Sequence, residues 1–202
     1  MLPAVDSLKP GVDQTRLRIL SATRELYASR GSRGTTTREV ADRAGVNEAT
    51  IFRHFGTKQQ LLGAMLEHFG GVAEMASIYE KVVALPTIEE QLRALGIASI
   101  DAIKRKEDLI RVTMSEELVA PELHACAWRA PSKARQLLDD FFANKVEAGE
   151  LHGDPAMLAR VFMSLTFAFV MARRIWSDHP STAEEAVSAI VALFLGGARG
   201  GK

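Results

Sequence analysis

The segment from residue 35 to residue 58, TTTREVADRAGVNEATIFRHFGTK, constrains the fold of this chain most, because it contains two helix signals separated by one tight turn. Thr36 and Glu39 have the Thr-x-x-Glu spacing of a capping box, which predicts a helix over residues 37–44. Gly45 follows, and glycine readily adopts the left-handed conformation that ends a helix. The segment therefore predicts a short helix that stops at a sharp turn.

A second short helix is predicted from Asn47, a favourable N-cap residue, to about His54. Apolar residues in both helices and in the turn would lock the two helices at a steep angle, and small alanines would allow close approach of their axes. These residues are Val40, Ala41, Ala44, Val46 and Ile51. Two helices packed in this way form a DNA-binding helix-turn-helix, whose second helix enters the major groove by its N-terminal end.

The side chains that these two helices would expose suit contact with DNA. Five of them are predicted to reach base edges: Arg38, Glu48, Ala49, Thr50 and Arg53. Four hydrogen-bond donors at the rim suit phosphate oxygens: Thr36, Thr37, His54 and Lys58. Two of the neighbouring side chains leave a second interpretation open. His54 is also compatible with a histidine packed at a helix end, and Arg43 with a solvated charge.

The charge distribution also points to the N-terminal part of the chain. The whole sequence carries 25 Lys and Arg against 25 Asp and Glu, so its net charge indicates no polyanionic partner. Residues 1–60, however, hold 10 basic and 6 acidic side chains, whereas the remaining residues hold 15 and 19. A basic first part joined to an acidic remainder places a nucleic-acid-binding surface near the N-terminus.

The rest of the sequence predicts an all-α fold, because no stretch shows the alternation of a β-strand. Before the helix-turn-helix, apolar residues recur at helical spacing from Asp13 until Gly31 and Gly34, and residues 1–12 are expected to form a loose arm. After it, helices are predicted at about 58–69, 87–103, 108–119, 132–149, 155–176 and 182–197. Three of these helices begin with a recognisable cap: Thr87 with Glu90, Asp154 with Pro155, and Thr182 with Glu185.

Over about residues 13–66 the sequence resembles the TetR family of bacterial repressors. The resemblance rests on a first helix, ILSATRELYASRG, followed by TTTREVADRAGVNEATIFRHFGTKQQLL with its Ala-Gly-Val turn, its His54-Phe55 pair and its Lys58. Beyond residue 66 the likeness is architectural. It implies a three-helix DNA-binding head joined to a helical body by the fourth helix. It also implies dimerisation through the last two helices, and a small molecule in the body that changes the spacing of two heads and releases DNA.

The chain departs from the family pattern at four positions of the second helix. Phe52 stands where the family usually has a tyrosine whose hydroxyl meets a phosphate, so one DNA contact is missing. Asn47 replaces the common serine cap, and Ala49 fills a position that is often glycine. Glu48 is acidic at a base-facing position, where it either accepts a hydrogen bond from cytosine N4 or repels phosphate.

These observations predict a sequence-specific transcriptional regulator, a repressor released from a near-palindromic operator in double-stranded DNA by an unknown small-molecule effector. The expected domains are an arm (1–12), a DNA-binding domain (13–58) and a ligand-binding and dimerisation domain (59–202). The helix over 155–176 is apolar nearly all round, so one face is expected to meet its own core and another a second subunit of a homodimer. Candidate ligand-binding side chains are Met114, Trp128, Phe141, Phe142, Phe162 and Trp176, although aromatic residues at helical spacing also suit an ordinary core.

Other classes of function find little support in the sequence. No nucleophile elbow, phosphate-binding glycine loop or HExxH is present, so we expect neither an enzyme nor a cofactor. His124 and Cys126, with Glu116, Glu117 and Glu122 nearby, match no zinc pattern, and Cys126 is interpreted as a small buried hydrophobe. A single cysteine, no signal peptide and no membrane span predict a cytoplasmic protein. The alternative function is a helical small-molecule-binding protein with weak or lost DNA affinity.

Overall fold

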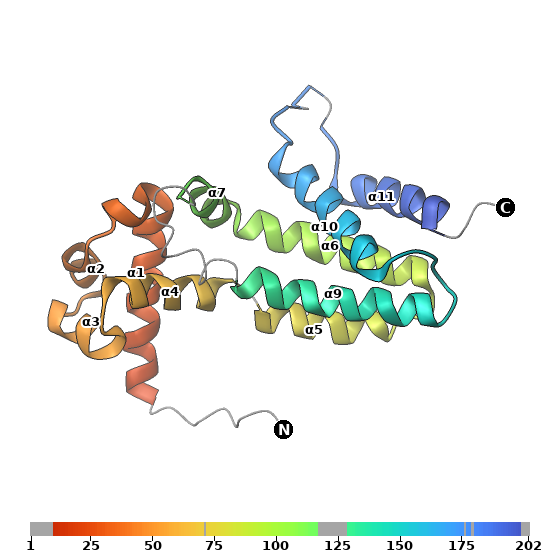
Figure 1. Cartoon of the computed structure of the whole chain (residues 1–202). Helices are drawn as coiled ribbons and strands as arrows, with labels where there is room; N and C mark the ends of the chain where they lie inside the picture. The colour runs from red at the N-terminus through yellow and green to blue at the C-terminus, as the bar shows by residue number, and fades with distance from the viewer. Residues whose placement is uncertain (1–9, 71, 117–128, 176, 179, 199–202) are drawn as a thin grey trace. The chain divides into compact units, whose positions relative to one another are not determined.

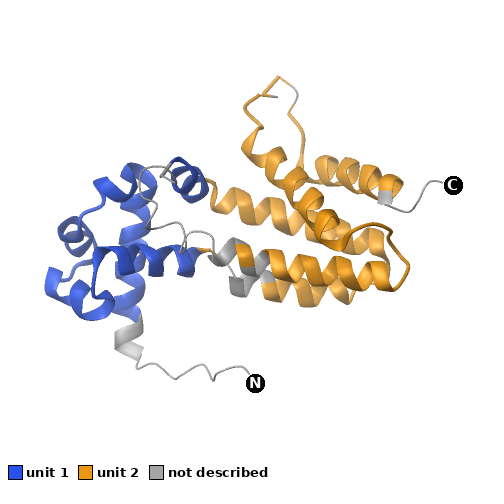
Figure 2. Cartoon of the chain, viewed as in Figure 1, with its two compact units in different colours: residues 1–69, 108–128 blue, residues 70–107, 129–202 orange. Residues whose placement is uncertain are grey.

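The structure, a computed structural model, describes residues 10–70, 72–116, 129–175, 177–178 and 180–198. All regular structure within these ranges is α-helical, which confirms the predicted fold class. The chain divides into two compact units (Figure 2). Unit 1 comprises residues 1–69 and 108–128, and unit 2 comprises residues 70–107 and 129–202. Each unit is described by itself.

Unit 1 contains the predicted helix-turn-helix. Its helices are α1 (Pro10–Gly34), α2 (Thr37–Ala44), α3 (Glu48–Phe55), α4 (Lys58–Phe69) and most of α7 (Glu107–Glu116), as Figure 1 labels them. Gly45 adopts the predicted left-handed conformation after α2, with φ 65° and ψ 41°. The N–H of Val46 then donates to the carbonyl of Ala41 at 3.0 Å, the reach-back bond that closes this type of helix end. Local signals therefore placed both helices correctly to within one residue.

One apolar core holds unit 1 together. Helix α1 packs against α2 and α4, and α3 packs against the same two helices. The core includes Ile19, Leu20, Leu26, Tyr27, Val40, Ile51, Phe55, Leu61, Leu62, Met65 and Leu109. Because α4 and Leu109 of α7 bury side chains in this core, the compact unit is larger than residues 13–58. The division into a DNA-binding and a ligand-binding domain remains a prediction about function.

Helix α1 begins earlier than predicted and ends at Gly34, as predicted. It begins at Pro10, within the expected arm, and proline is favourable at a first helical position; residues 1–9 lie outside the described part. At its other end α1 continues to Gly34, with a break at Gly31, where φ is 69° and ψ −172°. This positive φ suits glycine, and the hydroxyl of Thr35 donates to the Gly31 carbonyl at 2.7 Å. The break directs the chain into α2.

Unit 2 is a bundle of five described helices: α5 (Val72–Val83), α6 (Ile88–Arg105), α9 (Arg129–Glu147), α10 (Pro155–Met171) and α11 (Ala183–Ala198). Helix α6 packs against α5, α10 and α11, and α9 packs against α5 and α10. Figure 1 shows α5, α6 and α9 running along one another. Among the described helices, none combines the length and the apolar content needed to cross a bilayer.

The capping signals predicted for unit 2 are present. Both hydrogen bonds of the capping box join Thr87 to Glu90, and the pair of Thr182 and Glu185 forms the same two bonds. Asp154 accepts from the N–H of Ala156 at 3.3 Å and caps α10. Each of these side chains accepts from a backbone N–H that would otherwise lack an intrahelical partner.

One helix of unit 2 was not predicted, and the predicted end of another was wrong. Helix α5 was not predicted, because it follows the Gly70-Gly71 pair without a polar N-cap residue. Helix α10 ends at Met171 and does not reach Trp176. Beyond its end, Arg173 pairs with Glu107 and donates to the Val170 carbonyl at 3.1 Å. Helix α11 ends at Ala198, within one residue of the predicted end at the Gly196-Gly197 pair.

Gly96 marks a close approach of helices in unit 2 and leads to a prediction. A Cβ atom at this position would lie 2.9 Å from Cγ1 of Val187 and 3.6 Å from Cζ of Phe162. Val187 is branched at Cβ and buried, so it has little freedom to move aside. We expect Gly96→Ala to lower the free energy of unfolding by about 1–3 kcal/mol through overpacking, measured by urea denaturation.

Gly197→Ala is the matched control, because no atom lies within 4 Å of a Cβ at that helical position. This substitution should leave stability unchanged or raise it by up to about 1 kcal/mol through helix propensity. Equal effects of the two substitutions would contradict the close approach at Gly96.

Candidate nucleic-acid interface

Helix α3 presents two different faces. Ile51 and Phe55, one turn apart, are buried in the core of unit 1. Ala49, Phe52 and Arg53 lie on the opposite, exposed face. The spacing of the buried pair therefore orients the helix, and it leaves one short row of side chains for an external partner.

The polar residues of the first turn of α3 are hydrogen-bonded within the protein. Oδ1 of Asn47 accepts from both the backbone N–H and the hydroxyl of Thr50, each at 2.8 Å. The hydroxyl of Thr37, at the start of α2, donates to the carboxylate of Glu48. Glu48 thus ties the N-terminus of α3 to that of α2, a role that the sequence did not indicate.

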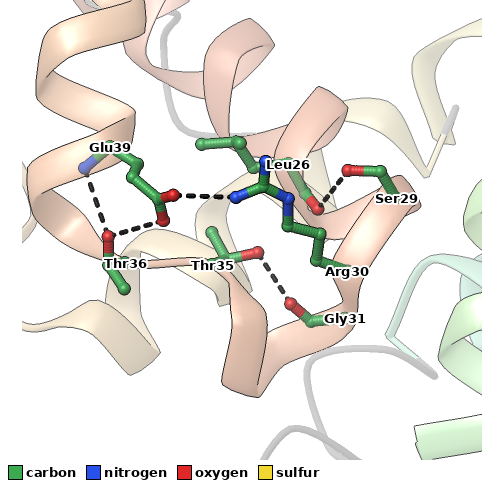
Figure 3. A network of polar contacts seen from close by, with 7 residues as sticks. All are labelled: Leu26, Ser29, Arg30, Gly31, Thr35, Thr36 and Glu39. Atoms are coloured by element: carbon green, nitrogen blue, oxygen red, sulfur yellow. Dashed lines mark hydrogen bonds and ion pairs between the residues drawn. The ribbon is translucent and has the colours of Figure 1, made fainter.

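A second polar network secures the N-terminus of α2 (Figure 3). The hydroxyl of Thr36 accepts from the N–H of Glu39 at 3.2 Å, as the capping signal predicts. The carboxylate of Glu39 accepts from the Thr36 hydroxyl at 2.8 Å and from the Arg30 guanidinium at 2.7 Å. Arg30, at the end of α1, therefore holds α2 in place.

This network predicts how the stability of the protein depends on pH. Hydrogen bonds from Thr36 and Arg30 to the Glu39 carboxylate hold its pKa below the ordinary value of 4.5. A lowered pKa in the folded state contributes stability above the unfolded-state pKa, and this contribution is lost as pH falls through the folded-state pKa. Glu39→Gln should therefore be less stable than the wild type at neutral pH, and the difference should shrink as pH falls below 4.5.

Urea denaturation at a series of pH values from about 7 to about 3 would measure this difference. Arg30→Gln should reduce the same pH dependence, because it removes one of the two groups that stabilise the Glu39 carboxylate. A Glu39→Gln difference that stays constant over the whole range would contradict the lowered pKa.

Six cations of unit 1 fall into two groups. Arg24, Arg30 and Arg43 each pair with a carboxylate: Asp108 at 3.5 Å, Glu39 at 2.7 Å and Glu25 at 2.6 Å, respectively. Arg38, Arg53 and Lys58 show no carboxylate partner within the described residues. The paired cations, Arg43 included, join helices of unit 1 to one another. The other three keep their charge available for an external anion.

Two family models cover most of the chain. The model for bacterial regulatory proteins of the tetR family matches residues 19–65. The model for the C-terminal domain of AefR-like transcriptional repressors matches residues 90–197, more than half of the sequence. The chain belongs to the TetR family. It is a DNA-binding transcriptional regulator, as the helix-turn-helix predicted.

Individual relatives of this TetR-family protein agree. It is 31% identical to YvkB of Bacillus subtilis (strain 168), an uncharacterized HTH-type transcriptional regulator, over 91% of this chain and 96% of that one. The fold is similar to that of a TetR-family regulator of Mesorhizobium loti MAFF303099, with a TM-score of 0.79 at 20% identity, covering 93% and 98% of the two chains. It also resembles FadR of Bacillus subtilis in complex with stearoyl-CoA, with a TM-score of 0.73 at 18% identity, covering 90% and 98%.

In this TetR-family protein the remaining predicted phosphate contacts lie at the start of α4 and the end of α3. Lys58 is the first residue of α4 and is half-buried, while the ring of half-buried His54 lies 6.1 Å from that of Phe55. Sequence reasoning missed two neighbours. Thr57 caps α4 by accepting from the N–H of Gln60 at 3.1 Å, which its Thr-x-x-Gln spacing indicates. The guanidinium of Arg16 lies 4.5 Å from the centre of the Phe55 ring, and no local signal reveals this contact.

The predicted ligand-binding side chains belong to both units. Phe141, Phe142 and Phe162 are fully buried in the core of unit 2, whereas Met114 belongs to α7 in unit 1 and its side chain is exposed. Trp128 and Trp176 lie outside the described residues, as do His124 and Cys126. The three phenylalanines pack ring against ring, so the geometry favours the alternative that they belong to an ordinary core.

Proposed function

We propose that this TetR-family regulator is a homodimeric repressor whose α2 and α3 dock in the major groove and whose unit 2 binds a small-molecule effector. The observation that carries this proposal is the arrangement around α3. Its exposed row of Ala49, Phe52 and Arg53 lies on a helix-turn-helix whose Arg38 and Lys58 have no carboxylate partner within the described residues. A second helix oriented in this way, with cations nearby, suits base contacts flanked by phosphate contacts.

The proposed phosphate contacts come from backbone and cationic groups. Because the hydroxyls of Thr36 and Thr37 donate to carboxylates, they are poorly placed to donate to phosphates as well. The N–H groups in the first turn of α2 point out of the helix end, where the helix dipole favours an anion. Together with Lys58 and His54, they would fix the position of unit 1 on the DNA.

A homodimer through α10 and α11 is supported by the exposed apolar side chains of these two neighbouring helices. Met157, Val161 and Leu165 recur every fourth residue along α10, opposite the buried Ala159, Phe162 and Val170. On α11, Leu193 is 74% exposed. Exposed apolar side chains in such a row are typical of a protein interface, and a two-fold axis would pair it with its own copy.

An effector site in unit 2 is supported by family membership and by the apolar character of this unit. FadR of Bacillus subtilis, whose fold is similar, was determined in complex with stearoyl-CoA. We propose that a predominantly apolar small molecule binds within unit 2 and favours a dimer whose two helix-turn-helices no longer match the operator. Such release requires that the effector prefer one of two states of the dimer.

Fluorescence anisotropy against DNA from upstream of the protein's own gene, with random DNA as the comparison and at two salt concentrations, would test DNA binding. Arg53→Ala should weaken binding to the specific site by about 1–3 kcal/mol and affect random DNA less, because it removes a base contact. Lys58→Ala should weaken binding to both DNAs and lower the salt slope by about one.

Arg135→Ala, which removes an exposed cation of α9 in unit 2, is the matched control and should bind as the wild type does. If the upstream DNA bound no better than random DNA, a genome-wide selection of bound fragments would be needed to look for another site. If that selection yielded no preferred site either, the protein would be a small-molecule-binding relative that has lost DNA affinity. If Arg53→Ala and Lys58→Ala both weakened binding to specific DNA and to random DNA by the same factor, the division into base and phosphate contacts would be contradicted.

A further inference from the structure

The exposed row of α3 has an unusual chemistry for a surface that meets DNA. Two of its three side chains, the methyl group of Ala49 and the ring of Phe52, have no hydrogen-bonding group. The side chain of Phe52 remains 46% exposed although it is a large apolar group in a small unit with its own core. Contact of this side chain with an apolar group of a partner would remove apolar surface from water, which is favourable.

The polar side chains beside this row are engaged within the protein. The Glu48 carboxylate accepts from the Thr37 hydroxyl, and the Thr50 hydroxyl donates to Oδ1 of Asn47 at 2.8 Å. Direct contact of Glu48 with cytosine N4, or a donated hydrogen bond from Thr50 to a base, would compete with these bonds. The side chain of Arg53 has no carboxylate partner within the described residues, so its guanidinium remains a donor for DNA.

The major groove of B-DNA offers one apolar group, the C5-methyl of thymine. Phenylalanine and alanine side chains contact this methyl favourably, whereas neither binds a phosphate or the polar edges of the other bases. An arginine one position further along the helix matches the N7 and O6 acceptors of guanine. The chemistry of the row thus corresponds to a thymine with a guanine close by.

We infer that Phe52, with Ala49, recognises a thymine methyl group in each operator half-site and that Arg53 recognises a neighbouring guanine. This inference rests on the proposed DNA-binding function and names the bases that the same surface reads. Glu48 is then a positioning residue, which acts through Thr37 on the placement of α3 and not through a base of its own.

Replacement of single thymines by deoxyuridine tests the inference, because it removes only the methyl group. The binding site is first obtained by selection from random duplexes with the full-length protein, and each thymine is then replaced in turn. We expect one or two thymines per half-site at which loss of the methyl lowers the affinity about three- to tenfold, as the burial of one methyl group implies. Phe52→Ala should bind the thymine site more weakly and lose most of its sensitivity to deoxyuridine.

Leu17→Ala is the matched control, because Leu17 of α1 in the same unit is also 46% exposed. This variant should keep the wild-type sensitivity to deoxyuridine. Circular dichroism and thermal unfolding would verify that both variants fold, as expected for exposed side chains. A selected site that tolerates deoxyuridine at every thymine would overturn this inference but leave the proposed DNA-binding function intact. Unchanged sensitivity to deoxyuridine in Phe52→Ala would have the same consequence. Failure of the wild type to select any site would overturn the proposed function as well.

Discussion

Leu193→Glu should convert the protein into a monomer and weaken operator binding by about 100-fold or more. Leu193 is 74% exposed on α11, so a glutamate there costs little within one subunit. In the proposed interface, however, the same carboxylate would be buried without a partner, which is strongly unfavourable. Loss of the second DNA-binding unit removes the effective-concentration advantage of a bivalent protein, which commonly amounts to about 100- to 10,000-fold.

Sedimentation velocity at micromolar concentration would measure the association state, and anisotropy the affinity for the operator. Ile175→Glu is a closely matched control, because Ile175 is also 74% exposed but lies beyond the end of α10. This control should remain dimeric. A second interface variant, Leu165→Glu on α10, should reproduce the monomer. If both interface variants sediment as dimers, α10 and α11 do not form the interface.

Phe142→Ala should lower the free energy of unfolding by about 3–5 kcal/mol. The Phe142 side chain is fully buried, and its ring centre lies 5.1 Å from that of Phe141, 5.5 Å from that of Phe194 and 6.0 Å from that of Phe162. The rings come from α9, α10 and α11. Removal of the central ring would leave a cavity that these helices cannot easily fill. The loss of stability therefore includes the lost free energy of burying the ring and the cost of the cavity left behind.

Urea denaturation followed by circular dichroism would measure the loss. Phe52→Ala serves as the control, because truncation of a half-exposed phenylalanine should change stability by no more than about 0.5 kcal/mol. The experiment also separates the two interpretations of the aromatic residues in unit 2. A loss of only about 1 kcal/mol for Phe142→Ala would contradict a packed core and favour a side chain that lines an effector cavity.

Local sequence signals predicted much of unit 1. A capping residue acts on backbone groups three positions away, and a glycine permits a left-handed turn at its own position. For this reason Thr36, Gly45 and Asn47 placed α2 and α3 within one residue of their observed bounds. Ile51, predicted to pack between the two helices, is buried in the core of unit 1. The prediction of a helix-turn-helix depended on these short-range interactions, whereas the family was indicated by the resemblance of the motifs.

Local signals failed where an element lacks a cap or a breaking residue at its end. Helix α5 begins after two glycines without a polar cap, so this helix was missed. Helix α10 stops at Met171, nine residues before Pro180, which was the nearest breaking residue in the sequence. The predicted end at Trp176 was therefore too late, and only the folded chain brings Arg173 to Glu107, 66 positions earlier.

Contacts between residues distant in the sequence decide which side chains of the candidate interface can contact DNA. The amino-acid sequence shows that Arg38, Arg43 and Arg53 are cations, but only the folded chain places Glu25 2.6 Å from Arg43. The same is true of Glu48, whose carboxylate receives the Thr37 hydroxyl from a neighbouring helix. Residue type and spacing thus decided the helix-turn-helix, since caps and periodicity act within a few residues. Which of its side chains remain for DNA depended on contacts between helices, because hydrogen bonds and ion pairs form between groups that folding brings together.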